Sequence, residues 1–120
     1  MTIYEELGGA EVLRRIVEAF YPKVVEDPLL APLFPADIDP VMEKQEQFLT
    51  QFFGGEPLYT EQHGHPRMRA RHMHIPITPQ HADAWLSCME RALIEVEVEE
   101  NLRLVVMDRL RGSAYFFVNS

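Results

Sequence analysis

Apolar side chains recur with a helical period along residues 10 to 26. Positions three and four apart lie on one face of a helix, so this spacing predicts an amphipathic helix. Pro22 interrupts the run, because proline lacks the amide that would bond back to residue 18 and disfavours helical geometry at Tyr21. We expect a kink at this point. The apolar positions of this stripe are Val12, Leu13, Ile16, Val17, Phe20, Tyr21, Val24 and Val25.

A short helix is expected before this one. Thr2 followed by Glu5 has the spacing of a capping box, in which each side chain bonds a free amide at the helix start. The pair Gly8-Gly9 ends that helix. After residue 26, prolines at 28, 32 and 35 predict turns, with a single helical turn at 29–33.

The next helix is predicted over 40–53. Asp39-Pro40 has the form of an N-cap followed by proline at the first helical position, and Gly54-Gly55 stops the helix. Gln45 falls on the apolar face, four residues after Val41 and three before Phe48. The apolar positions of this helix are Val41, Phe48, Leu49 and Phe52.

The second half of the chain predicts three more helices. Residues 56–65 have no period and are expected to form an irregular loop, after which Pro66 opens a short helix to about His72. Thr78-Pro79 is a second N-cap with a first-turn proline, opening a helix from 79 to about 96. A last helix spans about 99–117. The residues expected to face inward are Ala82, Trp85, Leu86, Met89, Leu93, Val96, Leu102, Val105, Val106, Leu110, Ala114 and Phe117.

No stretch has the pattern of a strand, so the predicted class is all-α, with one domain over 1–120. The chain has 120 residues, 47% of them hydrophobic and 25% charged, an ordinary globular balance. A net charge of -8 argues against nucleic-acid binding. The sequence has neither a membrane span nor a secretory signal pattern, which favours a cytoplasmic protein.

All five histidines lie between residues 63 and 81. Imidazole is the commonest protein ligand for metals, so this cluster raises the question of a metal site. The spacings are 2, 7, 2 and 7 residues (63, 65, 72, 74 and 81), and none of them is the four-residue spacing of a zinc helix. The single Cys88 excludes an internal disulfide and a cysteine-rich zinc site, and no base accompanies it to suggest a nucleophile.

Three polar side chains lie on apolar helix faces. Tyr21, Gln45 and Trp85 each carry a hydrogen-bond donor, and a buried donor without a partner is costly. Together with His72, which ends a short predicted helix, they could form a metal site with donors on the opposite side. Each residue also has a simpler interpretation as packing or surface. The pattern alone therefore predicts an all-α domain and leaves the metal site open.

Longer motifs carry a family resemblance. The stretch QFLTQFFGGEPLYTEQHGHPRMRARHMHIPIT, followed by ADAWLSCM, resembles the second group of the truncated haemoglobins. The resemblance runs from YEELGG near the start to VNS at residues 118–120. It implies a shortened globin fold, a two-over-two helical sandwich around haem b.

The resemblance also implies roles for individual residues. His72, in the dipeptide RH, matches the proximal ligand of the haem iron, while Tyr21 and Trp85 match the distal tyrosine and tryptophan. Gln45 occupies a distal position, and Val41 stands where many globins keep a hydrogen-bonding residue. The remaining expected haem contacts are Phe34, Lys44, Phe48, Met68 and Arg71, with Lys44 and Arg71 as partners of the propionates.

Three functions follow as alternatives. The first is tight, reversible binding of oxygen and other diatomic ligands, because three distal donors would stabilise the charge on oxygen. The second is a haem enzyme for nitric-oxide dioxygenation or peroxide reduction, with electrons from a separate reductase. The third, of another class, is a haem-free helical interaction module. The sequence leaves the oligomeric state open, a homodimer included.

Overall fold

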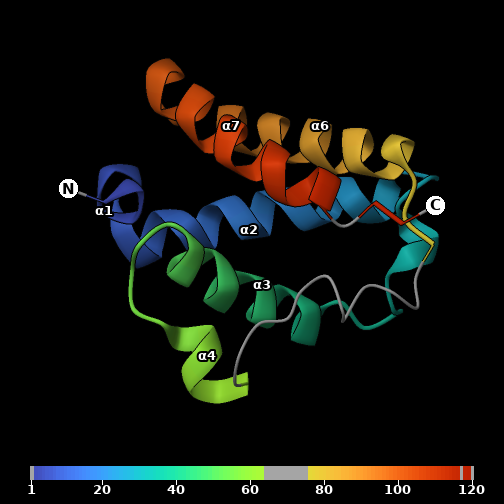
Figure 1. Cartoon of the computed structure of the whole chain (residues 1–120), viewed down its shortest axis with the longest axis horizontal. Coiled ribbons are helices and arrows are strands. Elements are labelled where there is room, and N and C mark those ends of the chain that lie inside the picture. The colour runs from blue at the N-terminus through green and yellow to red at the C-terminus, as the bar shows by residue number, and fades with distance from the viewer. Residues whose placement is uncertain (1, 64–75, 117, 120) are drawn as a thin grey trace.

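The computed structural model describes residues 2–63, 76–116 and 118–119 (Figure 1). All regular elements in these ranges are helices, which confirms the all-α class. Within the same ranges no helix is both long and apolar enough to cross a membrane. The helices are α1 (Ile3–Leu7), α2 (Gly9–Glu26), the 3-10 helix η1 (Ala31–Leu33), α3 (Asp39–Phe52), α4 (Leu58–His63), α6 (Pro79–Glu95) and α7 (Glu100–Phe116).

The helices form two layers. In Figure 1, α6 and α7 lie together with α2 behind them, and α3 and α4 lie below α2. The main packing contacts join α2 with α6, α6 with α7, and α2 with α3. Helix α1 lies across the start of α2, where the amide of Tyr4 donates to the carbonyl of Phe53 at 2.9 Å. This bond ties the N-terminal helix to the end of α3.

Helix α2 runs unbroken through Pro22. The prediction that Pro22 interrupts this helix is therefore wrong, while a bend at this point stays a prediction. Glu18, whose carbonyl loses its helical donor, and Pro22 are both exposed, so water can bond that carbonyl. The predicted stripe is otherwise buried, except that Val12 is only partly buried and Val25 is 48% exposed, against expectation.

The predicted capping box at the start of α1 and the predicted glycine turns that end α1 and α3 are confirmed. Thr2 and Glu5 form the complete capping box, and Gly8 ends α1 with a φ of 116° that favours glycine. At the end of α3, the amide of Gly55 donates to the carbonyl of Thr50 at 2.8 Å. A Cβ on Gly55 would lie 2.9 Å from that same carbonyl oxygen, so the turn requires glycine for its close approach.

Three predictions about elements need correction. Residues 56–65 are not a wholly irregular loop, because α4 occupies Leu58–His63. Helix α3 begins one residue early, with Asp39 inside the helix and Ile38 at the N-cap, where no side chain caps it. Val105 was expected inside and is 46% exposed. The short helix predicted from Pro66 to His72 lies outside the described residues.

Tertiary contacts explain why α4 is helical although its sequence has no helical period. The ring of Tyr59 is buried and lies edge-on to Phe48, with 5.9 Å between ring centroids. The backbone amide of Thr60 donates to the side-chain oxygen of Gln51 at 3.0 Å. Six residues are too few to show a periodic pattern, so α4 is set by its contacts with α3.

Candidate functional site

A line of aromatic rings crosses the space between α2, α6 and η1. The ring of Phe20 lies 5.1 Å from Trp85 and 4.9 Å from Tyr21, and Tyr21 lies 6.0 Å from Phe34, all between centroids. Each pair meets edge to face, the geometry that aromatic quadrupoles favour. The structure thus brings together Tyr21, Trp85 and Phe34, three of the predicted site residues, through Phe20.

Tyr21 is the most deeply buried polar candidate, with 2% of its surface exposed. Burial raises the pKa of its phenol well above the usual tyrosine value, because the charged form would lose its hydration. Its hydroxyl forms no hydrogen bond with any residue that the structure describes. The phenol is therefore neutral at physiological pH and has a proton to donate.

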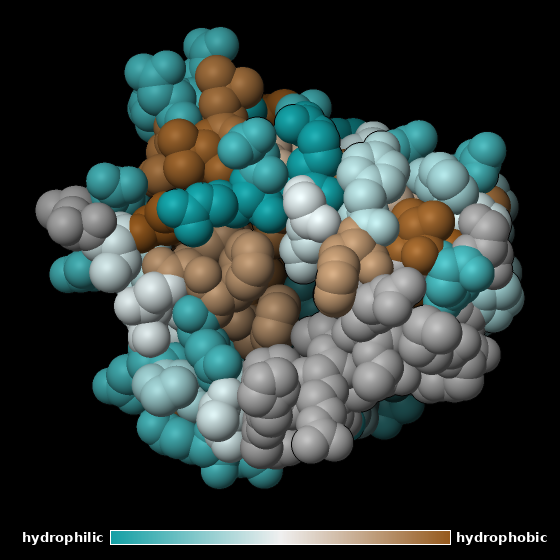
Figure 2. Space-filling model, viewed as in Figure 1, coloured by the Kyte–Doolittle hydropathy of each residue, from teal (hydrophilic) through white to brown (hydrophobic). Residues whose placement is uncertain are grey.

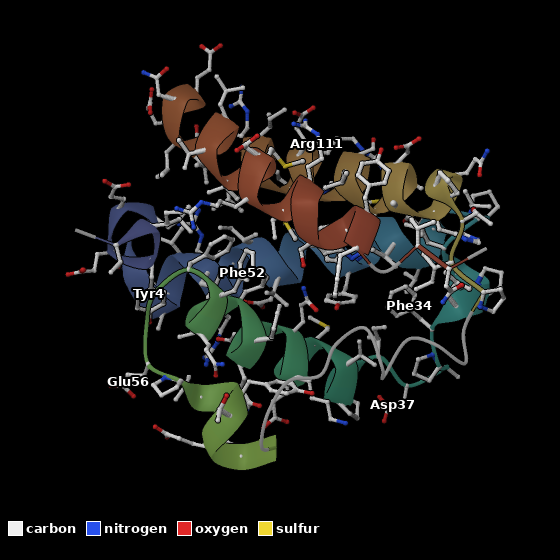
Figure 3. All side chains as sticks on the ribbon, in the orientation of Figure 1. Tyr4, Phe34, Asp37, Phe52, Glu56 and Arg111 are labelled. Atoms are coloured by element: carbon white, nitrogen blue, oxygen red, sulfur yellow. The ribbon has the colours of Figure 1, made fainter. Side chains whose placement is uncertain are left out.

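One face of α3 carries the second set of candidates. Val41, Gln45, Phe48 and Phe52 are spaced by four, three and four residues and share a face. All four are only partly buried, whereas Leu49, on the neighbouring face, is 1% exposed. Figure 3 shows Phe52 near the end of α3 and Phe34 beyond its opposite end. The apolar face of α3 is therefore incompletely covered by the described residues.

A second aromatic group limits this face toward α4. Phe48 and Phe52 stack with centroids 5.7 Å apart, and Tyr59 of α4 meets Phe48 edge-on. In the space-filling view of Figure 2, apolar side chains border part of a hollow on this face of the molecule. The site thus has an aromatic wall on two sides, one from α2 and α6 and one from α3 and α4.

The other predicted site residues are less constrained. Lys44 is exposed on α3, where its ammonium can reach a ligand at the surface. Val41 and Gln45 are partly buried on the incompletely covered face. The predicted iron ligand His72, and the predicted haem contacts Met68 and Arg71, lie outside the described residues.

Three residues contribute to the site without having been singled out as functional. Phe20 links the two distal candidates, and its place in the apolar stripe predicted only burial. His81 completes a capping box with Thr78 at the start of α6, where Nδ1 accepts the Thr78 amide at 2.9 Å. Asn119 bonds the backbone of Ile77 just before that helix. The spacing Thr78-x-x-His81 was the one available signal, with histidine in place of the usual glutamate.

The described part of the chain does not gather a conventional metal site. No group of three His, Cys, Asp or Glu side chains lies close enough together there to hold an ion. The arrangement that it does form is a line of edge-to-face aromatic rings that includes a buried, neutral phenol.

Comparison with known proteins identifies the family of this chain. The family model of the bacterial-like globins matches residues 2–116. The chain is 50% identical over 116 residues to the group 2 truncated hemoglobin YjbI of Bacillus subtilis (strain 168). The match covers 97% of this chain and 87% of that protein.

Solved structures agree with the sequence match. The group II truncated hemoglobin from Bacillus anthracis matches with a TM-score of 0.97 and 47% identity, over 100% of this chain and 92% of that one. The truncated oxygen-avid haemoglobin from Bacillus subtilis matches with a TM-score of 0.95 and 49% identity, over 99% and 100%. The chain therefore belongs to the bacterial-like globins and, among them, to the group 2 truncated haemoglobins, a family of haem-binding globins that take oxygen and other diatomic ligands.

Proposed function

We propose that this globin binds haem b through His72 and retains oxygen tightly by hydrogen bonds from Tyr21, Gln45 and Trp85. The observation that carries the proposal is the contrast between the buried phenol of Tyr21 and the partly exposed apolar face of α3. Tyr21 is enclosed and holds a proton that no described residue accepts, while the apolar face of α3 is left partly uncovered. Both features suit a pocket whose contents are a flat apolar group and a small polar ligand.

The described residues fit such a group. Phe34, Val41 and Phe48 offer partly buried apolar surface from η1 and α3, which a porphyrin would cover. At the edge, Lys44 is exposed and can pair with a propionate, and we assign the same role to Arg71. We further assign Met68 to the apolar contacts of the haem. These residues would bind and orient the group, which supplies an iron with one open position for diatomic ligands.

The donors of the pocket then decide how long a ligand stays. The Tyr21 phenol stays protonated because it is buried, and the Trp85 indole can only donate. Phe20 packs edge-on against both rings and so lies between the two donors. Each donated bond contributes about 0.5–1.5 kcal/mol net. Three together would slow oxygen release by more than about tenfold, since about 1.4 kcal/mol is a factor of ten.

The comparisons support this reading of the ligand. The matched Bacillus subtilis structure is of a haemoglobin described as oxygen-avid, and 49% of its sequence is identical. We extend that property to this chain as part of the proposal. A separate reductase that keeps the iron ferrous belongs to the same proposal.

A visible absorption spectrum of the purified protein is the first test. We expect an intense Soret band that disappears in His72→Ala, because that substitution removes the proposed iron ligand. The matched control is His74→Ala, two residues away, which should keep the band. A colourless protein that cannot take up haemin, or a band of equal intensity in His72→Ala, would contradict the proposal.

Oxygen dissociation kinetics test the donors. We expect Tyr21→Phe and Trp85→Phe each to speed oxygen release, because each removes a donor and keeps an aromatic ring. Phe34→Leu is a control that changes a ring of the same line without removing a donor. If both donor variants release oxygen at the wild-type rate, the proposed role of the distal pocket is wrong.

A further inference from the structure

The segment before α6 has an unusual hydrogen-bond requirement. Pro76 and Pro79 have no backbone amide, so Ile77 and Thr78 are the two donors between them. Both donate to side chains from elsewhere: Ile77 to Asn119 Oδ1 at 3.0 Å and Thr78 to His81 Nδ1 at 2.9 Å. No turn or helix of its own fixes this segment, and its position depends on those partners.

Asn119 bonds both backbone groups of one residue. Its side-chain oxygen accepts from the backbone amide of Ile77, and its backbone amide donates to the carbonyl of Ile77 at 2.9 Å. The two residues are 42 positions apart, so this pair closes the C-terminal tail onto the start of α6. Figure 1 shows the end of α7 beside the beginning of α6.

A second bond joins the same two regions one turn further along. The hydroxyl of Tyr115, on the last turn of α7, donates to the carboxylate of Asp83 on α6. This hydrogen bond, with some burial and the negative charge of Asp83, raises the pKa of the Tyr115 phenol, so the donor keeps its proton. We call the bonds Asn119–Ile77 and Tyr115–Asp83 the C-terminal clamp.

The clamp lies close in sequence to the distal tryptophan. Trp85 is two residues after Asp83 on α6, and eight residues after Ile77, which lies just before that helix. Its ring is only partly buried and meets Phe20 edge-on at 5.1 Å. Packing alone therefore leaves the indole some freedom, and the orientation of the first turns of α6 determines where its N–H points.

We propose that Asn119 and Tyr115 are positioning residues that fix the first turns of α6 and, through them, the indole of Trp85. The consequence of this positioning for ligands rests on the proposed function. A loosened clamp lets the indole move and shortens the time for which oxygen stays in the pocket. In this proposal the clamp acts on the pocket through the backbone of α6.

Fluorine NMR on the full-length protein tests the positioning step. Trp85 is the only tryptophan, so fluorotryptophan labelling gives one resonance, with or without haem. We expect Asn119→Ala and Tyr115→Phe to shift or broaden that resonance, because both remove a clamp bond. Asn119→Asp keeps the oxygen that accepts from Ile77 and should retain the wild-type signal. The matched control is Asn101→Ala, an exposed asparagine at the other end of α7.

Oxygen release tests the consequence. We expect Asn119→Ala to release oxygen about threefold to tenfold faster than wild type, the range for weakening one hydrogen bond. In a Trp85→Phe background the same substitution should have no further effect, since no indole remains to be positioned. Asn119→Asp should restore most of the wild-type rate.

The outcomes separate this inference from the proposed function. An unchanged fluorine resonance in both Asn119→Ala and Tyr115→Phe overturns the clamp, even where thermal stability falls, because a purely structural role lowers stability without moving the indole. An equal acceleration of release in the Trp85→Phe background overturns it as well. A protein without a Soret band contradicts the proposed function, and the fluorine experiment then still decides whether the clamp positions Trp85.

Discussion

Helices α2 and α3 pack against each other but bury very different surfaces. The buried residues of α2 are all apolar or aromatic, and Leu13, Phe20 and Val24 have no exposed surface. Helix α3 buries Leu49 together with two polar residues, Gln47 and Thr50. Among the described residues, α2 is therefore covered by the core over most of its apolar face, whereas the apolar face of α3 is covered only in part.

The buried polar residues of α3 are satisfied locally. Gln47 donates to the side-chain oxygen of Gln62 at 3.0 Å, and the Thr50 hydroxyl donates to the carbonyl of Glu46 at 2.8 Å. Hydrogen bonds to α4 and within α3 thus hold the side of the helix that faces inward. The side with Val41 and Phe48 packs against the core only in part, and it is the side that we propose for the haem.

The largest expected effect is on the free energy of unfolding, and it should differ between a phenylalanine truncated on α2 and one truncated on α3. Phe20→Ala removes a side chain with 0% exposure that contacts Trp85 and Tyr21. We expect a loss of about 3–5 kcal/mol in the free energy of unfolding, the usual range for a buried phenylalanine. Urea denaturation followed by circular dichroism measures it. A loss comparable to that of an exposed apolar residue such as Leu104→Ala would mean that α2 is not the core helix described above.

The partner substitution on α3 should affect haem more than folding. Phe48 is partly buried, so Phe48→Ala should destabilise the haem-free chain by less than Phe20→Ala does. It also removes apolar surface from the proposed haem contact, at about 25 cal/mol per Å² of buried area. We expect haem transfer to apomyoglobin to speed up about tenfold. If haem loss is unchanged while unfolding is strongly affected, the uncovered face of α3 is not the haem face.

The same contrast explains what the sequence could predict. The stripe of α2 and the capping signals at Thr2 and Thr78 are local patterns, and the structure follows them. Helix α4 was missed because Tyr59 and Thr60 are ordered by contacts with α3, which no local pattern records. Val105 was misplaced because an apolar residue beside a buried stripe also fits an exposed position on a long helix.

The site residues also divide into those that the sequence could predict and those that it could not. Tyr21 and Trp85 stood out as donors on apolar faces, and the family resemblance gave them roles; the structure brings both against Phe20. The clamp residue Asn119 could not be predicted, because its partner Ile77 lies 42 positions away. Long-range hydrogen bonds of this kind leave no spacing for a sequence pattern to detect.

The N-termini of α3 and α6 are capped differently. Removing the cap of α6 should have a smaller effect on stability than the phenylalanine substitution on α2. Helix α6 begins with a complete capping box at Thr78, whereas the N-cap residue of α3, Ile38, has no side chain that can accept a bond, and Asp37 accepts only from the amide of Asp39. Thr78→Ala should lower the free energy of unfolding by about 1 kcal/mol, the typical loss for an N-cap. Ser87→Ala, an exposed position inside α6, is the control and should be neutral or slightly stabilising. Equal effects at the two positions would show that the cap does not hold this helix.

Removing the Tyr21 hydroxyl should have the smallest effect on the free energy of unfolding near neutral pH. This effect should depend on pH. Burial raises the pKa of this phenol above the ordinary tyrosine value of 10.0, so the folded chain keeps its proton where the unfolded chain loses it. As far as Tyr21 is concerned, the free energy of unfolding should therefore not change with pH below pH 10.0. Above pH 10.0 it should fall as the pH rises, by at most about 1.4 kcal/mol per pH unit.

Tyr21→Phe should remove this part of the alkaline loss, because phenylalanine has no proton to release. Below pH 10.0 the two stability curves should run parallel and close together, since the described residues accept no hydrogen bond from that hydroxyl. Thermal unfolding at increasing pH, with the phenolate absorbance followed in parallel, measures the stability of both proteins below and above pH 10.0. A large loss of stability near neutral pH would mean that the hydroxyl holds the fold together rather than being kept for a ligand. In that case the contrast between the completed face of α2 and the open face of α3 would no longer point to Tyr21 as the donor of the pocket.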